Sequence, residues 1–213
     1  MKTVIAAGGP LSPAFLEKTL KESTCDYLIA ADRGLDVCLE AGVLPDLILG
    51  DFDSSRRAAG LPPEIEKLRY PCRKDYSDLE AAFHEAVDRG SEEITVLGAV
   101  GGRLDHFLAA VMNLTIPLKA GVPARIIDEN NEIRLFEKEF CITASYAAGR
   151  YLSLLPLAGR VTGLTLRGVS YPVRGAELSA DCASLGISHE ITGPEACGEW
   201  ARGTLIAVLS KDA

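Results

Sequence analysis

Residues 45–54 decide the fold, and they read Pro45-Asp46-Leu47-Ile48-Leu49-Gly50-Asp51-Phe52-Asp53-Ser54. The apolar run at 47–49 is continuous rather than alternating, which is typical of a parallel strand buried on both faces of a sheet. Similar short apolar runs alternate with helical patterns in the surrounding sequence, at residues 3–7, 27–31, 94–97 and 124–127. Strands that alternate with helices predict an α/β domain, with a parallel sheet and helices on both of its faces.

Two aspartates follow this strand directly. In extended backbone, residues two apart point to the same side, so Asp51 and Asp53 are expected at the carboxyl end of the sheet, where open α/β folds bind ligands. Two carboxylates about 4 Å apart repel by about 4 kcal/mol at an effective dielectric constant of about 20. A cation between them relieves this repulsion, and oxygen ligands completed by phosphates suit Mg²⁺. Turn or cap hydrogen bonds of the aspartates are the alternative.

The clearest helix is predicted over residues 77–89, where Ser77 and Glu80 fit a capping box. Asp78 falls in its first turn, and Lys74 and Asp75 come just before it. Free backbone N–H groups at a helix start, together with cations and carboxylates, predict a neighbourhood for phosphate and metal. The alternative is that Asp78 only complements the helix dipole.

A glycine-rich turn lies between the predicted strand at 94–97 and a helix over about 103–116, and it reads Gly98-Ala99-Val100-Gly101-Gly102-Arg103-Leu104-Asp105-His106. Glycines let the backbone approach a phosphate closely, and Arg103 can pair with its oxygens. The turn matches neither the dinucleotide fingerprint nor the P-loop. A tight turn that needs glycine, followed by Asp105 and His106 as first-turn residues, is the alternative. One face of this helix is apolar, with Leu104, Phe107, Leu108 and Val111.

Further clusters, Gly8-Gly9 and Asp32-Arg33-Gly34, follow the predicted strands at 3–7 and 27–31. Five successive strand ends thus carry glycine or aspartate clusters. A common ligand along one sheet edge explains this recurrence better than unrelated turns.

The pattern changes after about residue 130, where short strand candidates are separated by Gly, Pro and Ser turns. We therefore predict two domains, an α/β domain over residues 1–140 and a small antiparallel β domain over residues 141–213.

Composition excludes several classes of protein. Among 213 residues, 22 are basic and 30 acidic, and the net charge of −8 disfavours nucleic acid and anionic membranes as partners. We expect no signal peptide and no membrane span. The six cysteines form no C-x-x-C pair, so they are expected as reduced thiols in a cytoplasmic protein, and the three histidines lack zinc-ligand spacing.

These motifs, in this order and spacing, resemble the thiamine pyrophosphokinase family. The resemblance is carried by Asp32-Arg33-Gly34, by residues 45–54, by Lys74-Asp75-Tyr76-Ser77-Asp78-Leu79-Glu80 and by Gly101-Gly102-Arg103-Leu104-Asp105-His106. In the second half, Gly168-Val169-Ser170-Tyr171-Pro172 and Gly186-Ile187-Ser188-His189-Glu190 are similar to motifs of that family's β domain. The similarity extends over nearly the whole chain.

The resemblance implies an α/β nucleotide domain followed by a β-sandwich, in a homodimer with the active site between subunits. It implies transfer of pyrophosphate from ATP to the hydroxyethyl group of thiamine, which gives thiamine diphosphate and AMP with Mg²⁺ as cofactor. The implied metal ligands are Asp51, Asp53 and Asp78. The residues implied around the phosphates and the reacting hydroxyl are Lys74, Asp75, Asp78, Arg103 and Asp105.

The nucleotide site implied by the resemblance comprises Asp32, Gly34, Gly101, Gly102 and His106. The thiamine contacts implied are Tyr171, Ser188 and His189, supplied by the partner subunit. Two positions depart from the family pattern, with Arg33 where glycine is usual and His189 where asparagine is usual.

Other functions stay open at this point. A hydroxymethylpterin-type pyrophosphokinase shares the aspartate motifs and the reaction, whereas the Gly186-Ile187-Ser188 motif favours thiamine. A non-catalytic nucleotide or thiamine sensor does not need the full set of aspartates. A structural protein that uses its β domain only to dimerise leaves the clusters at the strand ends unexplained.

Overall fold

The structure is a computed structural model that describes residues 1–50, 61–69 and 76–212. The chain divides into two compact units, Met1–Glu129 and Asn130–Ala213, and each is described by itself. The domain boundary expected between residues 140 and 141 falls inside a strand of the second unit, Glu139–Thr143. Within the described ranges, no helix is both long enough and apolar enough to cross a membrane.

The first unit alternates strands and helices, as predicted from the apolar runs. In chain order its elements are β1 (Lys2–Ala6), α1 (Pro13–Ser23), β2 (Tyr27–Ala31), α2 (Gly34–Glu40), β3 (Leu47–Gly50), β4 (Glu66–Arg69), α3 (Asp78–Asp88), β5 (Glu93–Leu97), α4 (Leu104–Asn113), α5 (Thr115–Lys119) and β6 (Ala124–Ile127).

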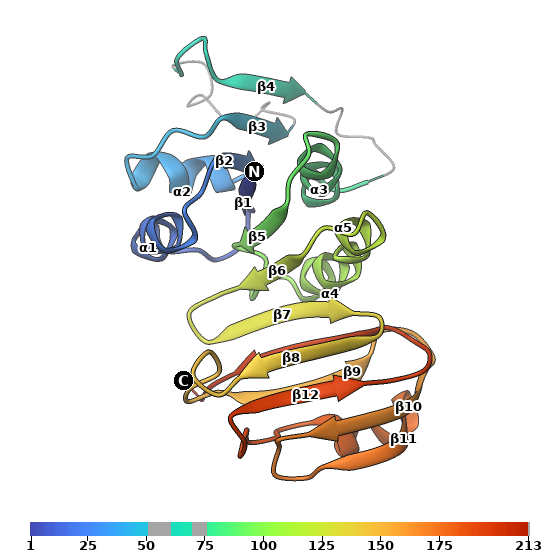
Figure 1. The fold of residues 1–213 in the computed structure, drawn as a ribbon. Coiled ribbons are helices and arrows are strands. Elements are labelled where there is room, and N and C mark those ends of the chain that lie inside the picture. The colour runs from blue at the N-terminus through green and yellow to red at the C-terminus, as the bar shows by residue number, and fades with distance from the viewer. Residues whose placement is uncertain (51–60, 70–75, 213) are drawn as a thin grey trace. The chain divides into compact units, whose positions relative to one another are not determined.

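The strands of this unit form a parallel sheet in the order β4-β3-β2-β1-β5-β6. Figure 1 shows α1 and α2 on one side of the sheet and α3, α4 and α5 on the other. The chain winds outward from β1 through β2 to β3 and then returns to place β5 on the opposite side of β1. The order therefore reverses between β2 and β5, and this reversal confirms the predicted α/β class and creates a switch point at the end of β1.

Burial explains why these segments are strands. Leu47, Ile48 and Leu49 are fully buried, as a strand covered on both faces requires. The helix predicted over 77–89 is α3, and the Ser77 hydroxyl accepts the Glu80 backbone N–H at 3.2 Å, which confirms the cap. The helix predicted over 103–116 is two helices, α4 and α5.

Only part of the apolar face predicted on α4 is buried. Leu104 and Leu108 are 72% and 55% exposed, and Met112 continues the same stripe at 58%. Val111 of the predicted face is buried, as is the neighbouring Ala110. The sequence pattern did not predict this exposed stripe, because periodicity alone does not say whether an apolar face is covered within the chain.

The second unit is a small antiparallel β domain, as predicted. Its elements are β7 (Asn131–Phe136), β8 (Glu139–Thr143), β9 (Tyr151–Pro156), β10 (Arg160–Arg167), β11 (Val173–Ser179), the 3₁₀-helix η2 (Ala180–Gly186), β12 (Glu195–Glu199) and β13 (Leu205–Ser210). One sheet contains β7-β13-β9 and the other β11-β10-β12-β8. Both contribute to one core, with Leu152 and Leu209 from the first sheet and Leu166 and Ala196 from the second, so the unit is a β-sandwich.

One expectation about the cysteines is wrong. Cys141 and Cys197 form a disulfide between β8 and β12, whereas Cys25, Cys38 and Cys182 are free thiols among the described residues. The two partners are 56 residues apart in sequence, yet the antiparallel register places their Cα atoms 4.2 Å apart. Sequence spacing could not reveal a pairing that the sheet register creates.

Candidate active site

A cavity of about 1040 Å³ lies in the first unit at the switch point of the sheet. Its wall is built from the segments that follow β1, β2 and β5 and from the starts of α3 and α4. Residues that the sequence singled out line it, namely Gly8, Asp32, Asp78, Gly101, Arg103 and Asp105. Segments far apart in sequence therefore meet at one sheet edge, as the clusters at the strand ends predicted.

Close backbone contacts form the floor of this cavity. The Gly9 N–H donates to the Gly98 carbonyl at 2.8 Å, and a Cβ at Gly9 would lie 2.4 Å from that oxygen. Only glycine permits this approach, because any side chain would collide with backbone. Gly34 acts in the same way at the start of α2, where a Cβ would lie 1.9 Å from the Ala6 carbonyl. Gly34 is buried and is not among the residues that line the cavity; its lack of a side chain lets α2 pack against the end of β1.

Asp32 adopts a strained backbone at the end of β2. Its φ is +51°, in the left-handed region that L-residues rarely adopt, and its N–H donates to the Leu49 carbonyl at 2.9 Å. A Cβ at Gly8 would lie 2.7 Å from Asp32 Oδ2, so the missing side chain at Gly8 leaves room for this carboxylate. Strain held at a cavity wall is typical of a functional position.

The glycine-rich turn before α4 presents an ion pair to the cavity. Gly101 and Gly102 both have positive φ, at 84° and 68°. The Arg103 guanidinium donates from Nε to Asp105 Oδ1 at 3.1 Å and from Nη2 to Oδ2 at 2.5 Å. Asp105 Oδ1 also accepts the His106 backbone N–H at 3.0 Å.

This pairing fixes the charges of both partners. The hydrogen bond from Arg103 and the backbone N–H of His106 lower the pKa of Asp105 to about 2, and the same pair raises the pKa of Arg103. Asp105 is therefore ionised near neutral pH and is a weak base. Its main physical effect is to orient the Arg103 fork, whose remaining donors can meet a phosphate.

The start of α3 brings a further carboxylate to the cavity. Asp78 occupies the first helical turn and lines the wall beside Tyr76 and Ser77. The other residues expected to hold metal or phosphate at this edge lie outside the described residues, namely Asp51, Asp53, Lys74 and Asp75.

The thiamine residues implied by the resemblance gather in the second unit. Tyr171 is 69% exposed, and its ring centroid lies 6.2 Å from that of His189. Ser188 has a φ of +58°, and its N–H donates to Ser153 Oγ at 3.0 Å. The three residues therefore form one local group.

His189 is a buried member of that group. The residue is 1% exposed, and within the described residues neither ring nitrogen has a hydrogen-bond partner. Its backbone N–H and carbonyl both pair with Leu152 at 2.8 Å. Burial lowers the pKa of the imidazole, which a backbone contact with Leu185 partly offsets. The side chain therefore supports the segment that carries Ser188, while Tyr171 and Ser188 offer the accessible groups.

Sequence reasoning missed a part of the cavity wall that is mostly apolar. The missed residues are Leu11, Val37, Ala109, Ala110 and Asn113. A signal was present on α4, because His106, Ala109, Ala110 and Asn113 follow the i, i+3, i+4, i+7 spacing of one helix face. Small side chains there leave space for a flat ring beside a polar end lined by glycine and charge.

The doubly wound sheet, the glycine-lined cavity at its switch point and the charged groups around it define the class of open α/β proteins, whose ligand sites lie at the carboxyl ends of the strands. Comparison with protein families gives the particular group. Residues 18–126 match the model described as thiamin pyrophosphokinase, catalytic domain, and residues 138–197 match thiamin pyrophosphokinase, vitamin B1 binding domain. The chain belongs to the thiamine pyrophosphokinase family, which is a family of transferases.

Individual relatives agree with this assignment along the whole chain. The thiamine pyrophosphokinase of Bacillus subtilis is 32% identical over 220 residues and covers 100% of both chains. The crystal structure of the Bacillus subtilis thiamine pyrophosphokinase superposes with a TM-score of 0.87 at 29% identity over 100% of both chains. That of Geobacillus thermodenitrificans gives 0.84 at 29% identity over 100% of this chain and 99% of its own.

Proposed function

We propose that this chain transfers pyrophosphate from ATP to the hydroxyethyl oxygen of thiamine, giving thiamine diphosphate and AMP. The observation that carries the proposal is the pair of family matches on one chain, catalytic and vitamin B1 binding, with most of the cavity wall inside the first. The cavity has the size expected for a nucleotide, since small-molecule sites usually measure about 300–1,000 Å³.

The chemistry of the wall supports a position for ATP in this cavity. The triphosphate lies at the charged end, where Gly8, Gly101 and Gly102 allow the backbone to come close and Arg103 supplies donors. The adenine ring lies at the apolar end against Val37 and Ala110. Asp32 is suited to accept hydrogen bonds from ribose hydroxyls, because it follows the second strand of the fold.

The carboxylates at this edge fit Mg²⁺. Asp78 lines the described cavity, and a carboxylate oxygen is the ligand type that Mg²⁺ prefers beside phosphates. Asp51 and Asp53 are proposed to join it in holding the ion. When bound, Mg²⁺ offsets the charge of the phosphate oxygens.

The reaction is proposed as in-line attack of the thiamine hydroxyl on the β-phosphorus, with AMP leaving. Positioning and charge neutralisation carry most of this type of catalysis. Arg103 stabilises the charge that develops on the transferred group, together with Lys74. Asp105 is a poor general base because its pKa is about 2, so it is assigned to orienting Arg103, and Asp75 remains the candidate base.

The second unit is proposed as the thiamine-binding and dimerisation domain. The exposed Tyr171 ring can stack on the cationic thiazolium ring of thiamine, and Ser188 offers a hydroxyl beside it. The exposed apolar stripe of Leu104, Leu108 and Met112 supports a homodimer, because such a surface is usually covered by a partner. We propose that the active site lies at this subunit interface and that the enzyme works in the cytoplasm, where ATP is supplied.

The test is product analysis with the full-length chain. Thiamine, ATP and Mg²⁺ are expected to give AMP and thiamine diphosphate in equal amounts, and omission of Mg²⁺ is expected to abolish both products. A hydroxymethylpterin offered in place of thiamine is the matched control and is expected to give no AMP. AMP formed only with the pterin, or ATP binding without AMP release, contradicts the proposal.

A further inference from the structure

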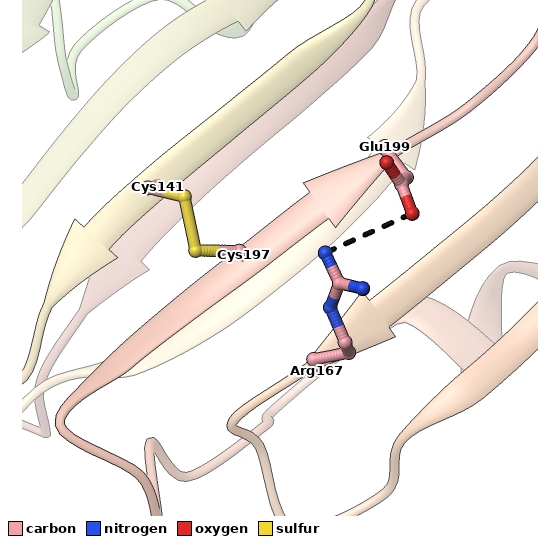
Figure 2. Close-up of a disulfide and its surroundings, with 4 residues drawn as sticks. All are labelled: Cys141, Arg167, Cys197 and Glu199. Carbon is pink, nitrogen blue, oxygen red and sulfur yellow. Dashed lines mark ion pairs between the residues drawn. A yellow bond between two sulfur atoms is a disulfide. The ribbon is translucent and has the colours of Figure 1, made fainter.

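The outward face of the four-stranded sheet carries a cluster of sulfur and carboxylate groups. Cys141 and Cys197 are direct cross-strand partners on β8 and β12, and Figure 2 shows their disulfide. Phe140 and Ile142 alternate with Cys141 and enter the core, so the sulfurs lie on the opposite face. Glu195 precedes Cys197 by two residues and shares its face, and the Glu195 carboxylate and both sulfurs lie within 4.8 Å of one another.

The charges around the sulfurs favour a cation. Glu139 and Glu199 are cross-strand partners on the same face, so their like charges repel. Arg167 is the partner of Cys197 on β10, and its guanidinium pairs with Glu199 at 3.7 Å (Figure 2). Across the described residues of β8, β12 and β10, three carboxylates (Glu139, Glu195 and Glu199) face two guanidinium groups, and one of these, on Arg160, pairs with Glu177 on β11.

We propose that Cys141, Glu195 and Cys197, once the disulfide is reduced, form a binding site for a thiophilic divalent cation of the zinc class. Zinc accepts thiolate and carboxylate ligands at about 2.0–2.3 Å in tetrahedral geometry, with water in the remaining position. Two sulfurs on one such ion lie about 3.8 Å apart, which suits residues whose Cα atoms are 4.2 Å apart. Thiolates are poor ligands for Mg²⁺, so this site differs in chemistry from the nucleotide cavity.

The redox state of the two cysteines controls this site. In the disulfide the sulfurs are bonded to each other and are not available as thiolates. Thiol exchange with a dithiol reductant breaks the S–S bond: the dithiol supplies two electrons and two protons and becomes a disulfide itself. The cation then displaces the two thiol protons as it binds. Oxidation of the two thiols to the disulfide therefore removes the site, and reduction by a dithiol restores it.

Cobalt(II) is the probe, because thiolate ligation gives a near-ultraviolet sulfur-to-metal absorption band that oxygen ligands do not produce. The full-length chain is reduced with dithiothreitol, freed of reductant under nitrogen and titrated with Co²⁺. The reduced chain is expected to show the band and to lose it when Zn²⁺ displaces Co²⁺. The oxidised chain is expected to show no band. A reduced chain without the band, or an oxidised chain with it, overturns the proposal.

Variants identify the ligands. Cys141→Ser and Cys197→Ser are expected to abolish the two-thiolate band, and Glu195→Gln is expected to weaken Co²⁺ binding by about 10- to 100-fold. Cys182→Ser is the matched control, because Cys182 is an exposed free thiol of the same unit, and it is expected to bind as the wild type does. Retention of the band in either cysteine variant, or its loss in Cys182→Ser, contradicts the assignment.

An alkylation experiment on the wild-type chain tests the site independently of the variants, in case a variant fails to fold. Zn²⁺ is expected to protect Cys141 and Cys197 of the reduced chain from iodoacetamide and to leave Cys182 reactive, as read by peptide mass spectrometry. Equal labelling of all three cysteines with and without Zn²⁺ rejects the site.

Discussion

Arg103, held by its ion pair with Asp105, brings a guanidinium to the cavity wall. Arg103→Met is expected to lower kcat by about 100- to 1000-fold, the usual cost of losing one donor to a developing charge. Steady-state kinetics of AMP release measure this. Arg160→Met is the matched control, because Arg160 makes an exposed ion pair with Glu177 in the second unit. It is expected to leave kcat within about twofold, and an equal loss in both variants would falsify the role of Arg103.

A substitution at Gly34 tests whether the close packing of α2 on β1 holds Asp32 in position. Gly34→Ala is expected to reduce the free energy of unfolding by about 1–3 kcal/mol, because the new Cβ collides with the Ala6 carbonyl. It is also expected to raise the KM for ATP, since the collision displaces the segment that carries Asp32.

Gly42→Ala provides the control for this substitution. Gly42 has a φ of +67° and open space around its Cβ position, so alanine there costs about 1 kcal/mol of backbone strain. Urea denaturation and ATP titration of both variants are compared. An unchanged KM in Gly34→Ala argues against the packing role.

The buried imidazole of His189 predicts a pH dependence. Its pKa is lowered in the folded chain from the value of 6.5, so the unfolded chain takes up the proton first as pH falls. Well above pH 6.5 the His189 imidazole is neutral in both the folded and the unfolded chain, so it adds no pH dependence to the free energy of unfolding there. Below it, the free energy of unfolding of the second unit is expected to decrease until the pH reaches the folded pKa.

Trp200 offers the measurement, since it is the one tryptophan of the chain and lies in the second unit. Urea titrations followed by its fluorescence at pH 7.5 and at pH values below 6.5 give the dependence. His189→Asn, which cannot titrate, is expected to remove this contribution. The prediction is wrong if the free energy of unfolding depends on pH to the same extent in His189→Asn and in the wild type.

At the scale of single residues, the sequence predicted which side chains meet at the sheet edge but not how they pair. Asp32, Asp78, Arg103 and Asp105 all line one cavity, as their positions after strands and at helix starts indicated. The low pKa of Asp105 follows from a side-chain geometry that no spacing rule contains. His189 was expected among the thiamine contacts, yet its burial depends on the fold of the surrounding segments.

At the scale of elements, helix caps position the site. Ser77 and Ser12 each accept a backbone N–H three residues on at 3.2 Å, so alanine at either is expected to cost about 1 kcal/mol. Ser77→Ala is also expected to raise the KM for ATP, because the first turn of α3 carries Asp78. Chemical denaturation and ATP kinetics measure the two effects. Ser12→Ala is the control, because Ser12 caps α1, whose first turn carries no acidic residue. A larger change in the KM for ATP in Ser12→Ala than in Ser77→Ala contradicts the prediction.

The type of most elements in the first unit was predictable, because caps and buried apolar runs are local signals, whereas the largely exposed β4 has no apolar run and was not predicted. Whether an apolar face is covered was not predictable, as the exposed stripe on α4 shows. Small residues such as Ala109 and Ala110 also carry no chemical signal of their own, although their helical spacing places them on the cavity wall.

At the scale of the whole molecule, the disulfide contributes to the stability of the β-sandwich. It joins residues 56 apart, and reduction is expected to lower the free energy of unfolding of this unit by about 2–4 kcal/mol. Urea titrations with and without dithiothreitol, followed by Trp200 fluorescence, measure the difference. Cys182→Ser is expected to behave as the wild type with and without dithiothreitol. If dithiothreitol still lowers the free energy of unfolding of Cys141→Ser, the effect does not come from this disulfide and the prediction is wrong.

The order of strands in each sheet was only partly predictable. Alternation of strands and helices implied a parallel sheet, because a helix between two strands returns the chain to the same end of the sheet. The pairing of β8 with β12, and with it the disulfide, depends on contacts between distant segments. Sequence patterns report local conformation, whereas register is settled by which strands share a core.

The central place of β1 has a consequence for how the polypeptide is made. β2 pairs with one edge of β1, but the other edge waits for β5, and Gly9 binds a carbonyl at residue 98. While the ribosome is still translating the intervening stretch, that edge has no neighbour and the pocket has no floor. A nascent chain therefore completes this cavity only after nearly half of the sequence has been translated, and until then the unpaired edge of β1 is free to pair with other strands.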